Sequence, residues 1–202
     1  MRDLEDYSRN MRVLLSTLGP QKTAAFTAAC AERLMPLYRK FCEEHKWDTN
    51  CDLERALDAS WYVLLQTAPV DCLRPSLRQV ADLMPYPGGL QSGLMTAAQN
   101  TVICIDVALR HLLDSRSRLL AVPECVLEAV ASVDTDRLPE AWSIGSTSPE
   151  AEVKELILLS VQREIIFQRR DVALLIASTG VAEVIDEIRA RAGRNAHGQS
   201  LV

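Results

Sequence analysis

The sequence contains no apolar run that approaches the length of a membrane-spanning helix. Crossing the hydrocarbon core of a bilayer takes about 20 predominantly apolar residues, and charged or polar side chains interrupt every apolar stretch before that length. The opening residues, MRDLEDYSRN, alternate in charge and include no apolar segment like that of a secretory signal. We therefore expect a cytoplasmic protein without a membrane partner.

Metal-binding and disulfide spacings are also missing. No two cysteines form a C-x-x-C pair, so free buried thiols are the simplest interpretation in a chain without a secretory signal. The Glu-x-x-His motif of di-metal helical bundles is absent, because Cys42 and Ala108 stand three residues before His45 and His111. We expect no metal and no cofactor.

Motifs for nucleotide binding and for hydrolysis are absent as well. There is no P-loop, no G-x-G-x-x-G after a strand pattern and no G-x-S-x-G turn. The formal net charge of −5 disfavours a nucleic-acid partner. The length of 202 residues is enough for one sizeable core, which favours a single domain.

The strongest pattern that is present lies between residues 23 and 41. Apolar side chains recur there at spacings of three and four residues, as on one face of an α-helix. They are Phe26, Cys30, Leu34, Leu37 and Phe41. The other faces are mostly alanine, and small side chains let neighbouring helices approach closely. The pattern predicts a central helix enclosed on nearly every side, bent at its interior Pro36.

Similar periods along the rest of the chain predict an all-α fold, and no stretch alternates apolar and polar residues over the length of a strand. The longest pattern starts at Ser148-Pro149-Glu150, a typical helix start, and continues to about Ser178. We predict a single-domain bundle of seven or eight helices over residues 1–191, with one long late helix. A polar loop at 134–147 and a loose tail at 192–202 complete the prediction.

Three blocks of the sequence resemble a known family. Residues 32–42 are similar to the E-R-x-x-P-x-Y-x-x-F-C signature of the YjaG-like family, bacterial proteins of unknown function. Leu57-Asp58 followed by Trp61 continues the match, and residues 168–172 resemble the family's E-E-R-D-I segment with two acids replaced. The resemblance implies an all-helical, cytoplasmic, bacterial protein, and it implies no activity.

Five charged residues within or beside apolar helix faces form the first candidate site. They are Glu32, Arg33, Glu164, Arg170 and Asp171. Removing such charges from water costs several kcal/mol per ion unless they are paired. We predict that they meet across the bundle, Glu32 with Arg170, or Arg33 with Asp171 or Glu164. A network that fixes helix register is favoured over a ligand site built on the same charges.

A second candidate site is an acidic face on which a basic protein partner could dock, because opposite charge speeds association and selects partners. Its residues are Glu43, Glu44, Asp48, Asp52, Glu54 and Asp58. A solvated helix face is the simpler interpretation of the same acids.

Two hypotheses for function remain. In the first, the protein catalyses nothing and binds another protein, most concretely as an inhibitor or immunity-type protein that neutralises a partner such as a toxin, an analogy at the level of fold. In the second, it is an enzyme or small-molecule binder. The site would then be assembled from Glu32, Arg33, Tyr38, Glu164, Arg170 and Asp171. We favour the first, because no catalytic motif is present.

Overall fold

The computed structural model describes residues 2–47, 52–86, 92–114, 122–136 and 149–194. Within these residues there are eight α-helices and three short 3₁₀ segments, and no strand. The α-helices are α1 (Arg2–Thr17), α2 (Pro20–His45), α3 (Asp52–Leu64), α4 (Leu73–Val80), α5 (Gly93–Leu113), α6 (Val122–Asp136), α8 (Pro149–Ala177) and α9 (Ile185–Arg194). The 3₁₀ segments are Val70–Cys72, Ala81–Leu83 and Val181–Glu183. The prediction of an all-α single domain is confirmed, and α8 is the expected long late helix.

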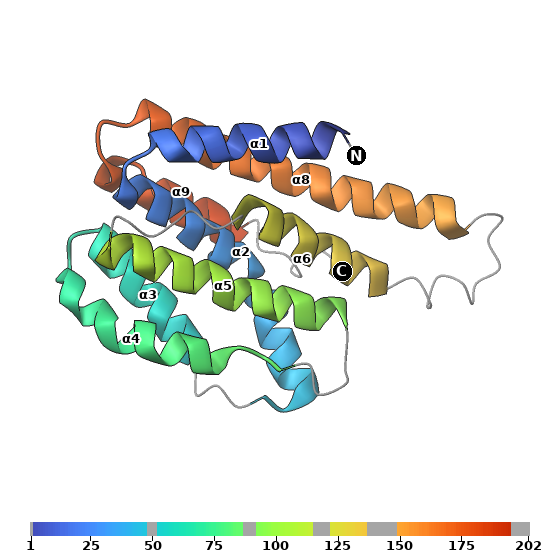
Figure 1. Ribbon diagram of the computed structural model, residues 1–202, viewed down its shortest axis with the longest axis horizontal. Coiled ribbons are helices and arrows are strands. Elements are labelled where there is room, and N and C mark those ends of the chain that lie inside the picture. Colours follow the sequence, from blue (N-terminus) through green and yellow to red (C-terminus); the bar gives the residue numbers. More distant parts are fainter. Residues whose placement is uncertain (1, 48–51, 87–91, 115–121, 137–148, 195–202) are drawn as a thin grey trace.

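Helix α2 runs through the middle of the bundle (Figure 1). Every residue from Thr23 to Ala31 is buried, and α2 packs against α3, α5, α6, α8 and α9. Its contact with α5 is the most extensive in the molecule, because alanines on α2 let the two backbones come close. Pro36 lies inside the helix without ending it, since α2 continues to His45.

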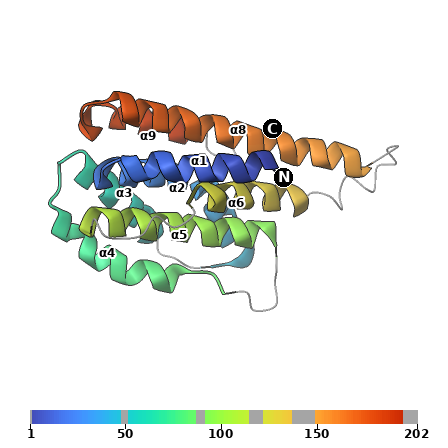
Figure 2. The ribbon, with the colours of Figure 1, turned by 45° about the horizontal axis from the view of Figure 1, so that its top comes forward.

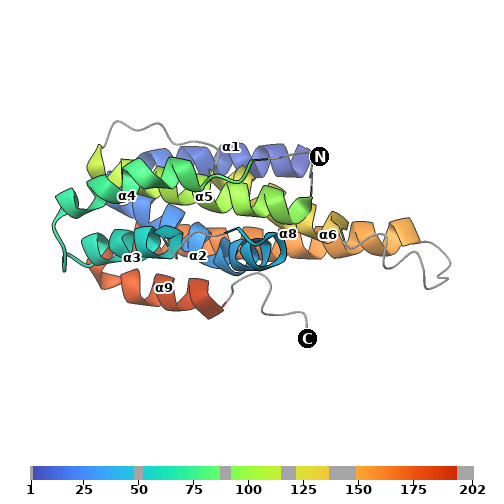
Figure 3. The same cartoon turned by 90° about the horizontal axis from the view of Figure 1, so that it is seen from below.

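The other helices cover α2 from two sides. In Figure 2, α8 and α9 lie along one side, α3, α4 and α5 lie on the other, and α1 and α6 lie between them. Figure 3 shows α1 and α9 at opposite edges, with α8 between them. Over its described side chains, helix α8 contacts the bundle through one face and leaves the opposite face exposed. In the part of the chain that the structure describes, no helix is both long and apolar enough to cross a bilayer.

Helices α5 and α6 come closest at Gly93. A Cβ atom at this position would overlap the backbone carbonyl of Ser132, so the crossing requires glycine. The Oγ of Ser92 caps α5 by accepting the backbone N–H of Met95 at 3.1 Å. Asp136, the last residue of α6, accepts the N–H of Gly93. The predicted loop at 134–147 therefore begins later than expected, and its residues 137–147 lie outside the described ranges.

The C-terminal boundary also differs from the prediction. Helix α9 continues to Arg194, and Ala192 is buried against the core. The prediction of a loose tail from residue 192 was therefore wrong for its first three residues. The short apolar side chain at 192 extends the buried face of α9 by one more turn. Residues 195–202 lie outside the described ranges.

Candidate functional site

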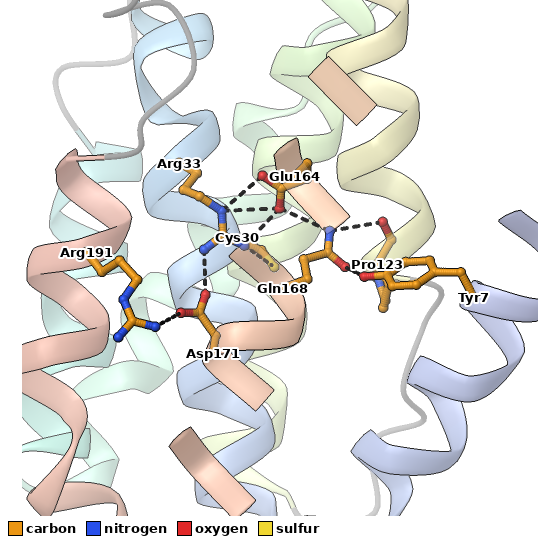
Figure 4. Close-up of polar contacts among 8 residues, drawn as sticks. All are labelled: Tyr7, Cys30, Arg33, Pro123, Glu164, Gln168, Asp171 and Arg191. Carbon is orange, nitrogen blue, oxygen red and sulfur yellow. Dashed lines mark hydrogen bonds and ion pairs between the residues drawn. The ribbon is translucent and has the colours of Figure 1, made fainter. Parts of the chain in front are cut away.

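A buried arginine is the centre of the candidate site. Arg33 comes from the alanine-rich helix α2, and only 1% of its side chain is exposed. Its Nη2 donates to Glu164 at 2.8 Å, its Nε lies 3.1–3.2 Å from both Glu164 oxygens, and its Nη1 donates to Asp171 at 2.7 Å (Figure 4). The predicted pairing of Arg33 with Glu164 or Asp171 is present, and it includes both acids.

Helix periodicity explains why α8 supplies both acids and the amide between them. Glu164, Gln168 and Asp171 are separated by four and three residues, so they share the face that turns toward α2. Gln168 Nε2 donates to Glu164 at 3.0 Å, and its Oε1 accepts the hydroxyl of Tyr7 from α1 at 2.8 Å. The same Nε2 lies 3.4 Å from the carbonyl oxygen of Pro123 on α6.

Two further residues complete this arrangement. Arg191 of α9 places its Nη1 3.6 Å from Asp171 Oδ1. The Sγ of Cys30, one turn before Arg33 on α2, lies 3.4 Å from Arg33 Nη2. We refer to the set as the ionic cluster. It consists of Tyr7, Cys30, Arg33, Glu164, Gln168, Asp171 and Arg191. It joins α1, α2, α8 and α9, and it contains two cations and two carboxylates.

Burial and charge act in opposite directions on the pKa values of the ionic cluster. Burial raises the pKa of Asp171, and the cation of Arg33 lowers it. Burial has the larger effect, because Arg33 also pairs with Glu164 and because the Oδ1 atom of Asp171 accepts no hydrogen bond. Burial alone would lower the pKa of Arg33, but the carboxylates of Glu164 and Asp171 raise it above its usual value. Burial also raises the pKa of the Cys30 thiol, which therefore stays protonated and is a poor nucleophile at neutral pH.

The ionic cluster is closed to solvent at its centre. Glu164 and Asp171 are 0% exposed, and Arg33 donates to both oxygens of Glu164 and to one oxygen of Asp171. Because neither carboxylate is in contact with solvent, a substrate in solution has no access to them in this conformation. The ion pairs connect α8 to α2 through Arg33. Among the described residues, no group of three or more histidine, cysteine, aspartate or glutamate side chains is placed to hold a metal ion.

The structure does not bring the other predicted network residues together. Glu32 is half-buried and accepts the indole N–H of Trp61 at 2.9 Å, so its pairing with Arg170 was wrong. Arg170 is exposed, because each residue turns a helix by about 100° and the position before Asp171 faces away from α2. Tyr38 is buried in the apolar core.

The predicted acidic face is largely neutralised by neighbouring cations. Glu54 pairs with Arg39 at 2.6 Å, and Asp58 pairs with Arg189 of α9. The remaining pairs are Glu44 with Lys40 at 3.6 Å and Asp52 with Arg55 at 3.3 Å. Glu43 is exposed at the end of α2, and Asp48 lies outside the described residues. These contacts leave the face without the concentrated negative charge that the hypothesis of a basic partner needs.

Four members of the ionic cluster were not identified from the sequence as site residues. Cys30 had been counted in the apolar period of residues 23–41, and Arg191 was the last residue of the predicted domain. A polar side chain inside an apolar stripe was the available signal for Gln168. No local signal existed for Arg191, because its partner Asp171 is 20 positions away on a different helix.

The raised pKa of Asp171 predicts a pH-dependent effect of Asp171→Asn. At pH values between the ordinary pKa of 3.8 and the raised pKa of the folded state, Asp171 binds more protons in the native state than in the unfolded state. The contribution of Asp171 to stability therefore falls as pH rises through this range. The variant lacks that contribution. We expect the difference in free energy of unfolding between wild type and the variant, measured in urea, to be largest near pH ~4 and to become smaller toward pH ~7. A difference that grows with pH would show that Arg33 outweighs burial.

These features define a class: an all-α, single-domain bundle with buried ion pairs between its long helix and its central helix. The chain belongs to the DUF416 family, described as a protein of unknown function, whose pattern matches residues 10–200. The crystal structure of a DUF416 family protein from Shewanella baltica OS155 is similar to it, with a TM-score of 0.61 and 18% sequence identity. That similarity covers 90% of this chain and 92% of the other, and at this identity it shows the shared fold alone. No curated protein matches the chain.

Proposed function

We propose that this protein works by binding another protein and catalyses no reaction, most concretely as an inhibitor or immunity-type protein that neutralises its partner. The proposal is supported by where large apolar side chains meet solvent. Ten such side chains are exposed among the described residues, and seven of them lie on two adjacent helices. They are Leu4, Val13 and Leu14 on α1, and Leu158, Leu159, Ile166 and Ile176 on α8.

This concentration favours a binding surface, because apolar side chains scattered singly are ordinary, whereas exposed apolar side chains gathered on neighbouring helices are typical of a protein–protein contact. The enzyme hypothesis has less support. Of its proposed residues, Arg33, Glu164 and Asp171 are closed to solvent, and Glu32 and Arg170 point elsewhere. We also propose that the chain belongs to the YjaG-like members of the family and is cytoplasmic. Both proposals depend on the signature at residues 32–42.

The test is affinity purification of the tagged full-length chain from its native host, at low and at high salt, beside a tag-only control. We expect one protein to co-purify in near-equimolar amount, and the purified chain to inhibit that protein's activity. A chain that elutes alone under both conditions contradicts the proposal. A chain that binds a partner without affecting it removes the inhibitor role and keeps the binding role.

A further inference from the structure

From Ile157 to Ala177, where side chains are described, the outward face of α8 carries one sign of charge. Between Ile157 and Ala177 this helix contains two acids, Glu164 and Asp171, and both are turned into the core. Three arginines in the same segment are exposed: Arg163, Arg169 and Arg170. The guanidinium of Arg169 lies over the ring of Tyr7, 5.5 Å from its centroid. A chain of net charge −5 therefore presents a purely cationic helix face at this position.

Apolar side chains run along the same face. Leu159, Ile166 and Ala173 are spaced by seven residues, which brings them to nearly the same side of the helix with a drift of about 20° per heptad. Leu159 is 56% and Ile166 47% exposed. Arg163 and Arg170 lie beside this stripe. An apolar seam flanked by charge is the pattern by which one helix packs on another.

A cleft opens beside the stripe, between α8 and α9. It is lined by Arg170, Ala173, Leu174 and Arg191. Arg191 already contacts Asp171 and Glu187. Arg170 has no ion-pair partner within the described part of the chain. Two guanidinium groups above an apolar floor suit a carboxylate at the end of a short aliphatic stem, the chemistry of a glutamate side chain.

The geometry points to the outward face of α8 as the docking surface for an amphipathic helix of another protein, with an apolar stripe flanked by aspartate and glutamate. One glutamate of that helix enters the cleft beside Arg170. This inference rests on the proposed function and reverses the charge of the partner expected from the sequence. The occupant is acidic because charge complementarity selects it.

Two other occupants fit the same face less well. A second copy packed antiparallel about Ile166 would place Arg163 of one copy opposite Arg169 of the other, and like charges in contact disfavour association. An anionic lipid surface attracts segments with many basic residues, whereas this face has three arginines on a chain of net charge −5.

The experiment combines in-host photocrosslinking with charge reversal. A benzoylphenylalanine replaces Ile166 in one full-length variant and Tyr62, a 51% exposed residue of α3, in a control. The charge-reversal variant is Arg163→Glu/Arg170→Glu. Its matched control, Arg74→Glu/Arg78→Glu, makes the same charge change on the exposed side of α4, across the molecule from α8 (Figure 2). Melting temperatures of both pairs check that each variant is folded.

The expected result is a crosslink from position 166, and none from position 62, to an acidic amphipathic segment of another protein. That segment, made as a labelled peptide, is expected to bind the α8 charge-reversal variant about tenfold or more weakly than wild type, and the α4 control within about twofold of wild type. A crosslink to a second copy overturns the inference. So does sedimentation with phosphatidylglycerol vesicles that is lost on charge reversal at α8.

Failure of the surface and failure of the proposed function give different results. If wild type co-purifies with a protein that the α8 charge-reversal variant still retains, the surface is wrong and the proposed function stands. If no protein co-purifies with wild type, the proposed function fails and the inference fails with it.

Discussion

Arg33→Met is expected to destabilise the native state by about 3–5 kcal/mol, because it leaves two carboxylates buried without their cation. Glu164 and Asp171 would remain buried, Glu164 beside Gln168 and Asp171 beside the more distant Arg191, without the cation that now lies between them. For a domain of this size each kcal/mol lowers the melting temperature by about 2–4 °C, so we expect a fall of about 6–20 °C. Urea and thermal unfolding followed by circular dichroism measure it.

The matched control is Arg39→Met on the same helix. Arg39 also pairs with a carboxylate, Glu54, but 53% of its side chain is exposed. Exposed ion pairs contribute about 0–1 kcal/mol, so this variant is expected to melt close to wild type. Equal effects of the two substitutions would mean that Arg33 is hydrated in solution, and the account of the ionic cluster as a closed centre would be wrong.

A triple variant distinguishes the destabilisation caused by unpaired buried carboxylates from the net contribution of the intact ion pairs to stability. Replacing Arg33 by methionine together with Glu164 and Asp171 by leucine removes all three central charges at once. Apolar replacements of buried ion pairs are often neutral or stabilising by about 1–4 kcal/mol. We expect the triple variant to recover most of the stability lost in Arg33→Met, with some loss remaining because Gln168 loses an acceptor.

The fold was predictable because its signals are local. The alanine-rich period of residues 23–41 marks α2, and Ser148-Pro149 marks the start of α8 within one residue. Each of these features acts within one or two helical turns, where spacing alone decides which side chains share a face. Boundaries were less accurate at α6 and α9, where tertiary contacts of Asp136 and Ala192 extend the helices.

The candidate site was predictable only in part, because pairing depends on how helices are rotated against each other. The sequence marked Glu32 and Arg33 as charges on an apolar helix, but they point about 100° apart. Arg33 therefore meets α8, whereas Glu32 meets Trp61 on α3. The pairing of the predicted acidic face was hidden from the sequence for a related reason, since Arg189, the cation beside Asp58, comes from α9.

Trp61→Ala is expected to cost about 3–5 kcal/mol, because it empties a large, fully enclosed volume at a point where three helices meet. Trp61 is 0% exposed. Its indole N–H donates to Glu32 of α2 at 2.9 Å, and the guanidinium of Arg189 on α9 lies 5.7 Å from its ring centroid. The substitution therefore removes an apolar contact, a hydrogen bond and a cation–π contact together.

Two control variants separate the contributions of the hydrogen bond and of the buried apolar volume to that loss of stability. Trp61→Phe keeps most of the apolar volume and loses the hydrogen bond, so we expect a loss near 1 kcal/mol. Tyr62→Ala truncates the neighbouring aromatic side chain, which is exposed, and we expect a change within about 0.5 kcal/mol. Because Arg189 both covers the ring and pairs with Asp58, hydrogen exchange should show α9 losing more protection than α5 in Trp61→Ala. If protection falls equally in both helices, Trp61 contributes to the common core without holding α9 in particular, and α9 is fastened to the bundle by other contacts, among them the one between Arg191 and Asp171.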